Sequence, residues 1–498
     1  VLFNKAGDTL LAVPRTLTSY TIPNTVKHIG DEAFWNCANL QSIVIPNSVT
    51  SIGNEAFFGC SPQNFVIPSS VMSIGDGAFA KSSSQRRSMF QDFNFTYEGV
   101  TLRYEIIAAN EVWVTHTFYG DGCDFSGELK IPSEVEFESK KYKVTRIGEG
   151  AFCGNLQSVV IPNSVKTIGT EAFAYCKNLQ SVVIPNSVVS IGEMAFRECP
   201  NLQSVVIPNS VKSIGADAFR ECPNLQGIVI PNSVKTIGTR AFYGCTNLQS
   251  ISMSESVANI DSFAFVLCPN LSKIEASPNN KRYSSKDGAL YSKSGDTLFL
   301  VPKKTAAFTI PNTVKCIGDE AFNFCDSLRS IVIPNSVTSI GNKAFTCCHN
   351  LQSVVIPNSV TSIKWGTFSS CTNLQSVVIP NSVTSIGTFA FNGCANLQNV
   401  VIPNSVTSIG AFAFAYCRRL QSIVIPNSVT NIGRSAFGDA VLQTFTIEAQ
   451  TPPIIRDCIF LDIEEILPTI YVPAASVEKY KAAEGWWKYY ADKIQPIK

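Results

Sequence analysis

The stretch VVIPNSVTSIGTFAFNGCANLQ (377–398) recurs with small changes along almost the whole chain. The isoleucine before its proline marks each copy, and fifteen copies align on this position. They lie at Ile22, Ile45, Ile67, Ile131, Ile161, Ile184, Ile207, Ile230, Met253, Ile310, Ile333, Ile356, Ile379, Ile402 and Ile425. In the two longest runs, which begin at Ile161 and Ile310, consecutive copies are 23 residues apart. A fixed period of this length is typical of a solenoid, in which each repeat forms one rung of a stack.

One repeat, residues 179–199, indicates how a rung would be built. Its SVVI segment is β-branched and is followed at once by proline, which predicts a short strand. Alternation along this strand turns Val182 and Ile184 inward and Ser181 and Val183 outward. The segments VVSIG and MAF then fit a return path of loop and a short helical turn. One repeat cannot bury its apolar side chains alone, so we expect strands of neighbouring rungs to pair in parallel and cover them.

Composition excludes several classes of function. Charged residues make up 15% of the 498 residues, below the roughly 25% of a typical globular protein. Because 39 Lys and Arg nearly balance 38 Asp and Glu, nothing attracts the chain to nucleic acid. No apolar run approaches the ~18 residues of a membrane span. The chain begins at Val1 without a signal sequence, so we expect any leader or anchor to lie upstream or to have been removed.

The repeat pattern resembles a known family. Its opening, L-x-x-V-x-I, is that of leucine-rich repeats, and the remainder, IPNSV followed by IG, AF and C, resembles the BspA-like branch of that superfamily. The segment YVPAASVEKYKAAEGWWKYYADKIQPI (471–497) resembles the closing unit of the family, and residues from VTLRYEIIAANEVWVTHT (100–117) to GEGAF (148–152) resemble its opening unit. The resemblance implies a surface-displayed adhesin or binding protein of an anaerobic mouth or gut bacterium.

Repeat and resemblance together predict the fold class. We expect a β-rich α/β solenoid of 23-residue leucine-rich repeats, with a parallel concave sheet, short helical or irregular convex segments, and β-hairpin inserts. Residues 2–34 also parallel residues 290–322 at a constant offset of 288, and each copy opens with a predicted hairpin. The expected domains are a partial array with a leading hairpin (1–80), an opening unit with a divergent repeat (81–147), an array (148–276), a hairpin insert (277–306), a second array (307–447) and a C-terminal cap (448–498).

The cysteines point to packing rather than to chemistry. Twelve of the 17 share one register, three residues after the phenylalanine of each repeat. Neighbouring rungs would bring their Cα atoms to about 5 Å, but in-register side chains point the same way and do not converge on a disulfide. A straight column also cannot surround a tetrahedral zinc ion. We therefore expect buried free thiols, with Cys123, Cys316, Cys347 and Cys458 as candidates for reactive ones.

No catalytic constellation is present. The three histidines, His28, His116 and His349, have no carboxylate and nucleophile around them in a recognisable motif. Asp121 and Asp124 faintly suggest calcium but are simpler to interpret as a turn. We therefore expect no enzyme activity, no cofactor and no metal site.

The outward strand positions form the candidate binding surface. They make two uncharged columns, one mainly of serine and one mainly of valine, and an exposed apolar stripe of this length is typical of a binding face. Valine is also simply a good strand former, which is the plainer explanation. The candidate partner-binding residues are Ser181, Val183, Ser204, Val206, Val229, Val355, Val378 and Val401.

A second surface competes with these columns. The two positions after each phenylalanine vary freely, and their aromatic and arginine side chains are of the kind that dominates protein interfaces. They include Trp35, Tyr175, Arg197 with Glu198, Arg220 with Glu221, Tyr243, Phe324 and Tyr416.

The sequence therefore predicts a non-enzymatic, monomeric, surface-displayed binding or adhesion protein that contacts an extracellular host or microbial protein. Nucleic acid is not an expected partner. The alternatives are a structural spacer and a glycan-binding module.

Overall fold

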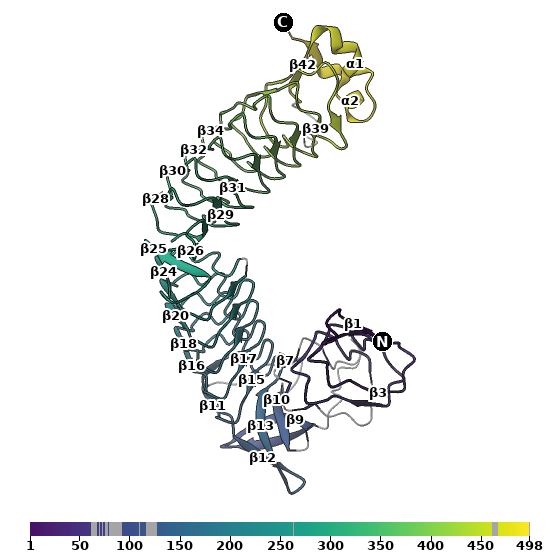
Figure 1. Cartoon of the computed structure of the whole chain (residues 1–498), viewed down its shortest axis with the longest axis vertical. Helices are drawn as coiled ribbons and strands as arrows, with labels where there is room; N and C mark the ends of the chain where they lie inside the picture. The colour runs from purple at the N-terminus through teal and green to yellow at the C-terminus, as the bar shows by residue number, and fades with distance from the viewer. Residues whose placement is uncertain are drawn as a thin grey trace. The chain divides into compact units, whose positions relative to one another are not determined.

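Figure 1 shows the computed structural model, in which the repeats stack as rungs. The structure describes residues 1–60, 67–68, 70–71, 73–74, 78, 92–108, 110–115, 127–261, 263–460 and 467–497. His116, Asp121, Cys123 and Asp124 lie outside these residues. The chain forms two compact units. Unit 1 consists of Val1–Leu248 and Met253–Cys268, and unit 2 consists of Gln249–Ser252 and Pro269–Lys498.

The SVV segments of successive repeats build one parallel sheet of unit 1. Its strands are β11 (Gly127–Lys130), β14 (Leu156–Val160), β16 (Ser181–Val183) and β18 (Ser204–Val206). Each residue lies opposite the residue 23 positions later, as Val183 does with Val206. The equivalent segments of the next two repeats are β20 (Gly227–Ile230) and β22 (Ser250–Met253). The prediction of stacked 23-residue repeats with parallel strands is confirmed.

A second parallel sheet, which the sequence did not predict, runs along the same rungs. It is formed by the residues before the glycine of each repeat, with Ile191 opposite Ile214. Its strands are β13 (Lys140–Ile147), β15 (Thr167–Ile168), β17 (Ser190–Ile191), β19 (Ser213–Ile214), β21 (Thr236–Ile237) and β23 (Asn259–Ile260). Where both sheets are continuous, as from β16 and β17 to β18 and β19, a rung therefore pairs with its neighbour along two lines rather than one.

The segment between the glycine and the cysteine of each repeat is a run of turns, not the short helical turn that we expected. In one repeat Met194 (φ 52°) and Glu198 (φ 54°) are left-handed, which interrupts a right-handed helix. Their N–H groups instead donate to carbonyls of the next rung, at Ala216 and Arg220, both at 2.8 Å. Stacking thus replaces helical hydrogen bonds in this part of the rung.

Antiparallel strands adjoin the stacked rungs of unit 1. The meander β8 (Asp92–Tyr97), β9 (Val100–Ala108) and β10 (Glu111–Thr115) pairs through β10 with β13, which also pairs with β12 (Glu134–Phe137). The first rungs contain β1 (Leu2–Phe3), β2 (Thr9–Ala12), β4 (His28–Ile29), β6 (Ser51–Ile52) and β7 (Ser73–Ile74) in one sheet, and β3 (Ser19–Thr21) with β5 (Ser42–Val44) in another.

Unit 2 repeats this design. After β24 (Lys273–Ala276), one sheet joins β25 (Tyr283–Lys286), β26 (Ala289–Ser292), β27 (Thr297–Leu300), β29 (Cys316–Ile317) and β31 (Ser339–Ile340). The SVV sheet contains β28 (Ala307–Thr309), β30 (Ser330–Val332), β32 (Ser353–Val355), β34 (Ser376–Val378) and β36 (Asn399–Val400). The two-residue strands that correspond to the second sheet of unit 1 form a further sheet in unit 2. Its strands are β33 (Ser362–Ile363), β35 (Ser385–Ile386), β37 (Ser408–Ile409), β39 (Asn431–Ile432) and β41 (Ile454–Ile455).

Unit 2 ends in a different structure that covers the last rung. A sheet of β38 (Ser422–Ile425), β40 (Thr444–Ile447), β42 (Thr469–Val472) and β43 (Ile494–Pro496) is accompanied by η1 (Ala474–Ser476), α1 (Val477–Lys481), α2 (Trp486–Tyr489) and η2 (Ala491–Lys493). Tyr480, Trp487 and Tyr490 are buried here. The indole N–H of Trp487 donates to the C=O of Pro453 at 2.7 Å. These aromatic side chains close the apolar interior of the stack.

The core consists of columns of identical side chains. Phe173, Phe196 and Phe219 stack with centroids 5.2 and 5.3 Å apart and nearly parallel rings. Beside them, the thiol of Cys222 donates to the C=O of Phe196 in the previous rung at 3.0 Å. The same 26-residue step joins eight further pairs, with Sγ to carbonyl oxygen distances of 2.9 to 3.3 Å. Cysteine therefore recurs because it fills the tight turn and also gives a buried carbonyl a hydrogen bond.

Close approach of the rungs favours glycine at one position, although Asp261 and Lys364 occupy it in two rungs. A Cβ placed on Gly215 would lie 2.5 Å from the carbonyl carbon of Gly192. Such a clash with backbone cannot be relieved by rotating a side chain. The glycine of each IG pair thus sets the spacing that lets the adjacent strands pair.

Candidate functional site

In unit 1 the outward side chains of β14, β16, β18, β20 and β22 form an uncharged surface, which we call the Ser–Val face. Charged residues adjoin it at both ends, Glu128 and Lys130 on β11 and Glu275 on β24. In unit 1 the side chains of Val183, Val206 and Val229 are 69%, 63% and 69% exposed, and Ser181 and Ser204 are exposed beside them. Pairing of β16 with β18 places Val183 next to Val206 and Ser181 next to Ser204. From β18 to β20 the stack continues through the N–H of Gln226, which donates to the C=O of Gln203 at 3.4 Å.

The remaining candidate residues form the equivalent face of unit 2. Val355, Val378 and Val401 are 59%, 56% and 77% exposed. Val355 pairs with Val378, and Val377 pairs with Val400, so Val401 follows in the same column. All eight predicted residues are therefore exposed, in two groups that belong to different units.

Because side chains alternate along each strand, residues of the Ser–Val face can be substituted without disturbing the core. Between the exposed side chains of Ser181 and Val183 lies Val182, which is buried, and Val205 has the same place in the next rung. The exposed residues contribute little to the core, which is filled by the alternate positions. The Ser–Val face is thus formed by side chains that the core does not need. Its rows of valine methyl groups and serine hydroxyls are about 4.8 Å apart, the distance between neighbouring strands.

The competing surface in unit 1 is a ladder that we call the Arg–Tyr edge, formed by Tyr175, Arg197, Arg220 and Tyr243. The guanidinium carbon of Arg197 lies 5.5 Å from the centre of the Tyr175 ring, and that of Arg220 lies 5.2 Å from the Tyr243 ring. Each arginine also pairs with the following glutamate of its own rung, at 2.9 and 3.0 Å. The edge is therefore charged but internally neutralised.

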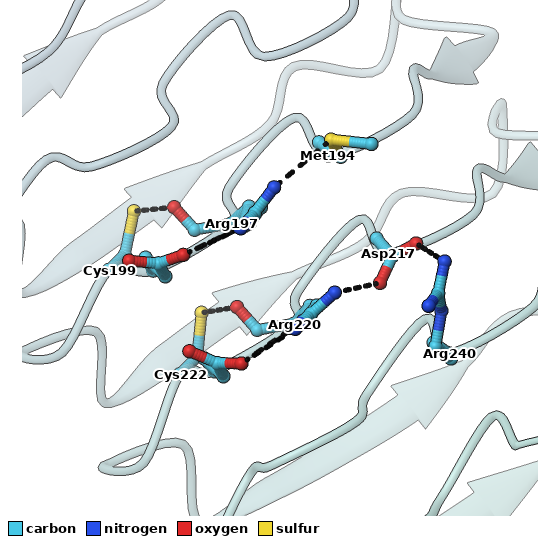
Figure 2. Close-up of polar contacts among 9 residues, drawn as sticks. Met194, Arg197, Cys199, Asp217, Arg220, Cys222 and Arg240 are labelled. Atoms are coloured by element: carbon cyan, nitrogen blue, oxygen red, sulfur yellow. Dashed lines mark hydrogen bonds and ion pairs between the residues drawn. The ribbon is translucent and has the colours of Figure 1, made fainter.

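A buried carboxylate anchors this edge (Figure 2). Asp217 is only 1% exposed; its Oδ1 lies 3.5 Å from Nη1 of Arg220, and its Oδ2 lies 3.0 Å from Nη2 of Arg240 in the next rung. In the preceding rung Met194 has the same position, and its sulfur contacts Arg197 at 3.6 Å. Burial by itself would lower the pKa of Arg220, but the hydrogen bonds and negative charges of Glu221 and Asp217 outweigh it, so the pKa of Arg220 is raised. The Asp217 site could not be predicted from the sequence, because this position also holds Met and Arg in neighbouring rungs.

In unit 2 the corresponding edge is aromatic. The ammonium of Lys343 lies 4.5 Å from the centre of the Trp365 ring, and the rings of Phe389 and Phe412 stack at 4.9 Å. Trp365 and Tyr416 are exposed. The positions on either side of each repeat's phenylalanine thus give each unit a different edge, whereas the Ser–Val face is nearly the same in both.

Burial makes several of the cysteines poor nucleophiles. Burial raises the pKa of Cys176, Cys325 and Cys417 to about 12, so the thiol form dominates at neutral pH. Among the candidates outside the column, burial raises the pKa of Cys347 to about 11, and Cys316 is partly exposed. The twelve cysteines of the column are free thiols, as expected, whereas Cys153, which lies outside the column, is disulfide-bonded.

Two histidines make contacts between rungs. Nδ1 of His28 lies 2.7 Å from Oγ of Ser51, and Nδ1 of His349 lies 2.6 Å from a carboxylate oxygen of Asp326. Across the described ranges, no three His, Cys, Asp or Glu side chains gather as ligands for a metal ion. Within the same residues, no helix has the length and apolarity to cross a membrane.

Comparison with known proteins supports one family. A family model described as a BspA type leucine rich repeat region matches residues 11–100, 129–226, 212–294, 292–401 and 338–466. These ranges include most of both units. A comparison with the curated proteins found no match.

Solved structures show the same fold. A leucine rich cell surface protein from Faecalibacterium prausnitzii is 30% identical, with a TM-score of 0.53 over 71% of this chain and 94% of that one. A leucine-rich repeat protein from Eubacterium ventriosum is 23% identical, with a TM-score of 0.51 over 70% and 95%. The pneumococcal vaccine antigen PcpA is 19% identical, with a TM-score of 0.54 over 81% and 97%.

Proposed function

Because the chain belongs to the BspA type of leucine-rich repeat proteins, we propose that it is a non-enzymatic binding or adhesion protein displayed on a cell surface. Its partner is an extracellular host or microbial protein, which it contacts as a monomer and without a cofactor. The proposal keeps the six domains given above and assigns partner contact to the Ser–Val face. A cell-surface location is supported by the similarity to the leucine rich cell surface protein of Faecalibacterium prausnitzii.

One observation carries this proposal: an exposed column of valines without a single charge recurs in both units. Exposure reaches 80% at Val332, so these methyl groups are in water when the face is free. Removing exposed apolar surface from water is the main driving force of protein association. The hydroxyls of the neighbouring serine column can satisfy polar groups of a partner at little desolvation cost.

The test compares two double substitutions in the full chain. Val206→Lys with Val229→Lys places two charges on the face while the buried Val205 and Ile228 stay unchanged. Arg197→Ala with Arg220→Ala alters the Arg–Tyr edge of the same rungs. Binding is measured by surface plasmon resonance against a set of purified extracellular matrix proteins, with circular dichroism as the check on folding.

We expect the lysine pair to weaken binding at least about tenfold, because buried unpaired charges are costly, and the alanine pair to weaken it less than about threefold. Loss of binding in the alanine pair alone would move the site to the Arg–Tyr edge. If no matrix protein binds the unchanged chain, the proposed partner class is wrong and a spacer role gains support.

Exposed aromatic side chains favour a glycan as the second candidate partner. Trp365 and Tyr416 of unit 2 are 43% and 41% exposed, and sugar rings pack against aromatic faces. A glycan array probed with the unchanged chain and with Trp365→Ala tests this candidate. Signals that disappear with the tryptophan would support it, and an array without signals would exclude it for the sugars displayed.

A further inference from the structure

Three polar side chains are buried together where the second array of unit 2 begins. Lys303 follows β27, and Glu320 and Asn323 follow β29. Their exposed fractions are 2%, 8% and 3%. The N–H of Lys303 donates to the C=O of Leu271 at 2.9 Å, so the preceding rung covers this site. The nearby residues of the sequence belong to the apolar core, since Val301, Phe322 and Cys325 are all fully buried.

Hydrogen bonds hold the three residues in one small region. Nζ of Lys303 donates to the backbone C=O of Asn323 at 2.6 Å. The N–H of Asn323 in turn donates to the C=O of Glu320 at 2.9 Å. The side-chain carbon Cγ of Asn323 is only four bonds from the oxygen that the amine contacts. The amine and the carboxamide are therefore neighbours, and water has little access to them.

The hydrogen bonding of this cluster is incomplete. Within the described residues, the buried atoms Oε2 of Glu320 and Oδ1 of Asn323 have no hydrogen-bond partner. Leaving such groups unpaired costs about 1–3 kcal/mol each. A purely structural cluster would be expected to saturate these acceptors. An amine, a carboxamide and a carboxyl group in an apolar site are also the set of groups that can form an amide bond between side chains.

We propose that Lys303 and Asn323 form an intramolecular isopeptide bond, with Glu320 as the group that transfers protons. The Glu320 carboxylate first accepts a proton from the Lys303 ammonium, which leaves a neutral amine. The nitrogen lone pair attacks Cγ of Asn323, and the carbonyl electrons move to Oδ1. Glu320 then returns its proton to the amide nitrogen and takes one from Nζ. The carbon–nitrogen bond of the carboxamide breaks, ammonia leaves, and Glu320 ends protonated.

The electrostatics of the site suit this proton transfer. Burial raises the pKa of Glu320 to about 7, while the charges of Lys343 and Lys303 lower it and that of Asp319 raises it. A carboxyl group with a pKa near neutral pH both accepts and donates a proton readily. Fixing the amine beside its target also supplies the advantage of an intramolecular reaction. The step needs no oxidant, metal or other reactant.

The matching position of the partial array (1–80) lacks the reacting groups. In the segment 288 residues earlier, the position of Lys303 is occupied by Arg15 and that of Asn323 by Trp35. The position of Glu320 is again a glutamate, Glu32. The guanidinium of Arg15 lies 4.7 Å from the centre of the Trp35 ring. Without an amine or a carboxamide, this position cannot form the bond, and it serves as a control within the same chain.

Mass spectrometry of the full chain tests the proposal. After reduction of disulfides, the folded protein incubated at neutral pH should be lighter than its sequence by one ammonia. Tryptic digestion should yield a branched peptide in which residues 294–304 are joined to residues 316–329. The branched peptide distinguishes the bond from a succinimide, which also releases ammonia but joins no second peptide.

Three variants assign the roles, each checked for folding by circular dichroism. Lys303→Arg and Asn323→Ala should keep the full mass, and Glu320→Gln should fold but cross-link at least about a hundredfold more slowly. A folded, unchanged chain that keeps its full mass and gives no branched peptide would overturn the proposal. Cross-linking of Glu320→Gln at the normal rate would remove Glu320 from it. Neither result depends on the partner proposed above.

Discussion

The segments 2–52 and 290–340 have the same backbone but different buried chemistry. Strands β2 and β27, β3 and β28, β4 and β29, β5 and β30, and β6 and β31 begin and end at positions that differ by 288 residues throughout. The hairpins also share their register, since Leu2 pairs with Ala12 as Leu290 pairs with Leu300. Repetition has therefore preserved the backbone of this module down to single residues.

What differs is the environment of one cation. Lys303 is buried beside Glu320 and Asn323, whereas Arg15 and Glu32 are exposed and Arg15 contacts an indole ring. An arginine beside an aromatic ring keeps its guanidinium in water, while a lysine within the core must be compensated by nearby oxygen atoms. The comparison teaches that a repeated backbone can carry a reactive cluster in one copy and an inert contact in the other.

The largest effect should come from removing the cation itself. Lys303→Met removes the buried amine and one of the two lysine charges that lower the pKa of Glu320, so local stability should fall by about 3 kcal/mol at pH 8. Arg15→Met removes an exposed contact and should cost less than about 1 kcal/mol. Hydrogen exchange of the amides in β27 and β29, compared with β2 and β4, measures both effects. Equal losses in the two segments would contradict the contrast.

The next effect concerns pH. The pKa of Glu320 is raised from 4.5 to about 7, so the folded state holds a proton that the unfolded state has lost between these values. The contribution of Glu320 to the free energy of unfolding is therefore fully present below about pH 4.5, and it decreases as the pH rises to about 7. Glu320→Gln stays neutral, so its stability relative to the parent chain should rise by roughly 3 kcal/mol between pH 4 and pH 8.

The measurement for Glu320→Gln is the slope of the exchange-derived stability of β27 and β29 with pH. A cross-link would shift the parent curve as a whole without removing this slope. Glu32→Gln in the exposed copy is the matched control. A parent slope that survives in Glu320→Gln would show that another group titrates.

The smallest effect should be the same in both segments. The thiols of Cys60 and Cys348 donate to the carbonyls of Phe34 and Phe322 at 2.9 and 3.0 Å, and both are fully buried. Cys60→Ala and Cys348→Ala should therefore each cost about 1–2 kcal/mol, through the lost hydrogen bond and a small cavity. Chemical denaturation followed by exchange at β6 and β31 tests this equality. A difference above about 1 kcal/mol would mean that the two copies pack differently despite their common backbone.

Much of the rung could be predicted from the sequence, because apolar alternation and the following proline act within a few residues. The inward Val182 and Ile184 and the outward Ser181 and Val183 are placed as expected. The strand at Ser190–Ile191 was missed because two residues carry no strand signal of their own. Their pairing exists only when the rungs are stacked, and the same holds for the turns with left-handed Met194 and Glu198.

The functional surfaces were predictable to different degrees. The exposure of Val206 and Val229 follows from alternation alone, whereas their contact with a partner stays a prediction. The cluster of Lys303, Glu320 and Asn323 could not be found in the sequence, since Glu32 occurs in the same local pattern GDEAF and is exposed. Burial of a charged group depends on which rung lies above it, and this is set by residues more than thirty positions away, such as Leu271.

The 23-residue register has a consequence for the gene. Within an array, neighbouring rungs meet in the way that Val183 pairs with Val206 and Cys222 donates to Phe196. Removing or duplicating 23 codons therefore joins one intact rung to another. Recombination between such similar coding segments can lengthen or shorten the protein without breaking a core contact. We expect natural variants to differ in length by whole rungs while the Ser–Val face stays continuous. The length of the protein can then evolve separately from the chemistry of its surface.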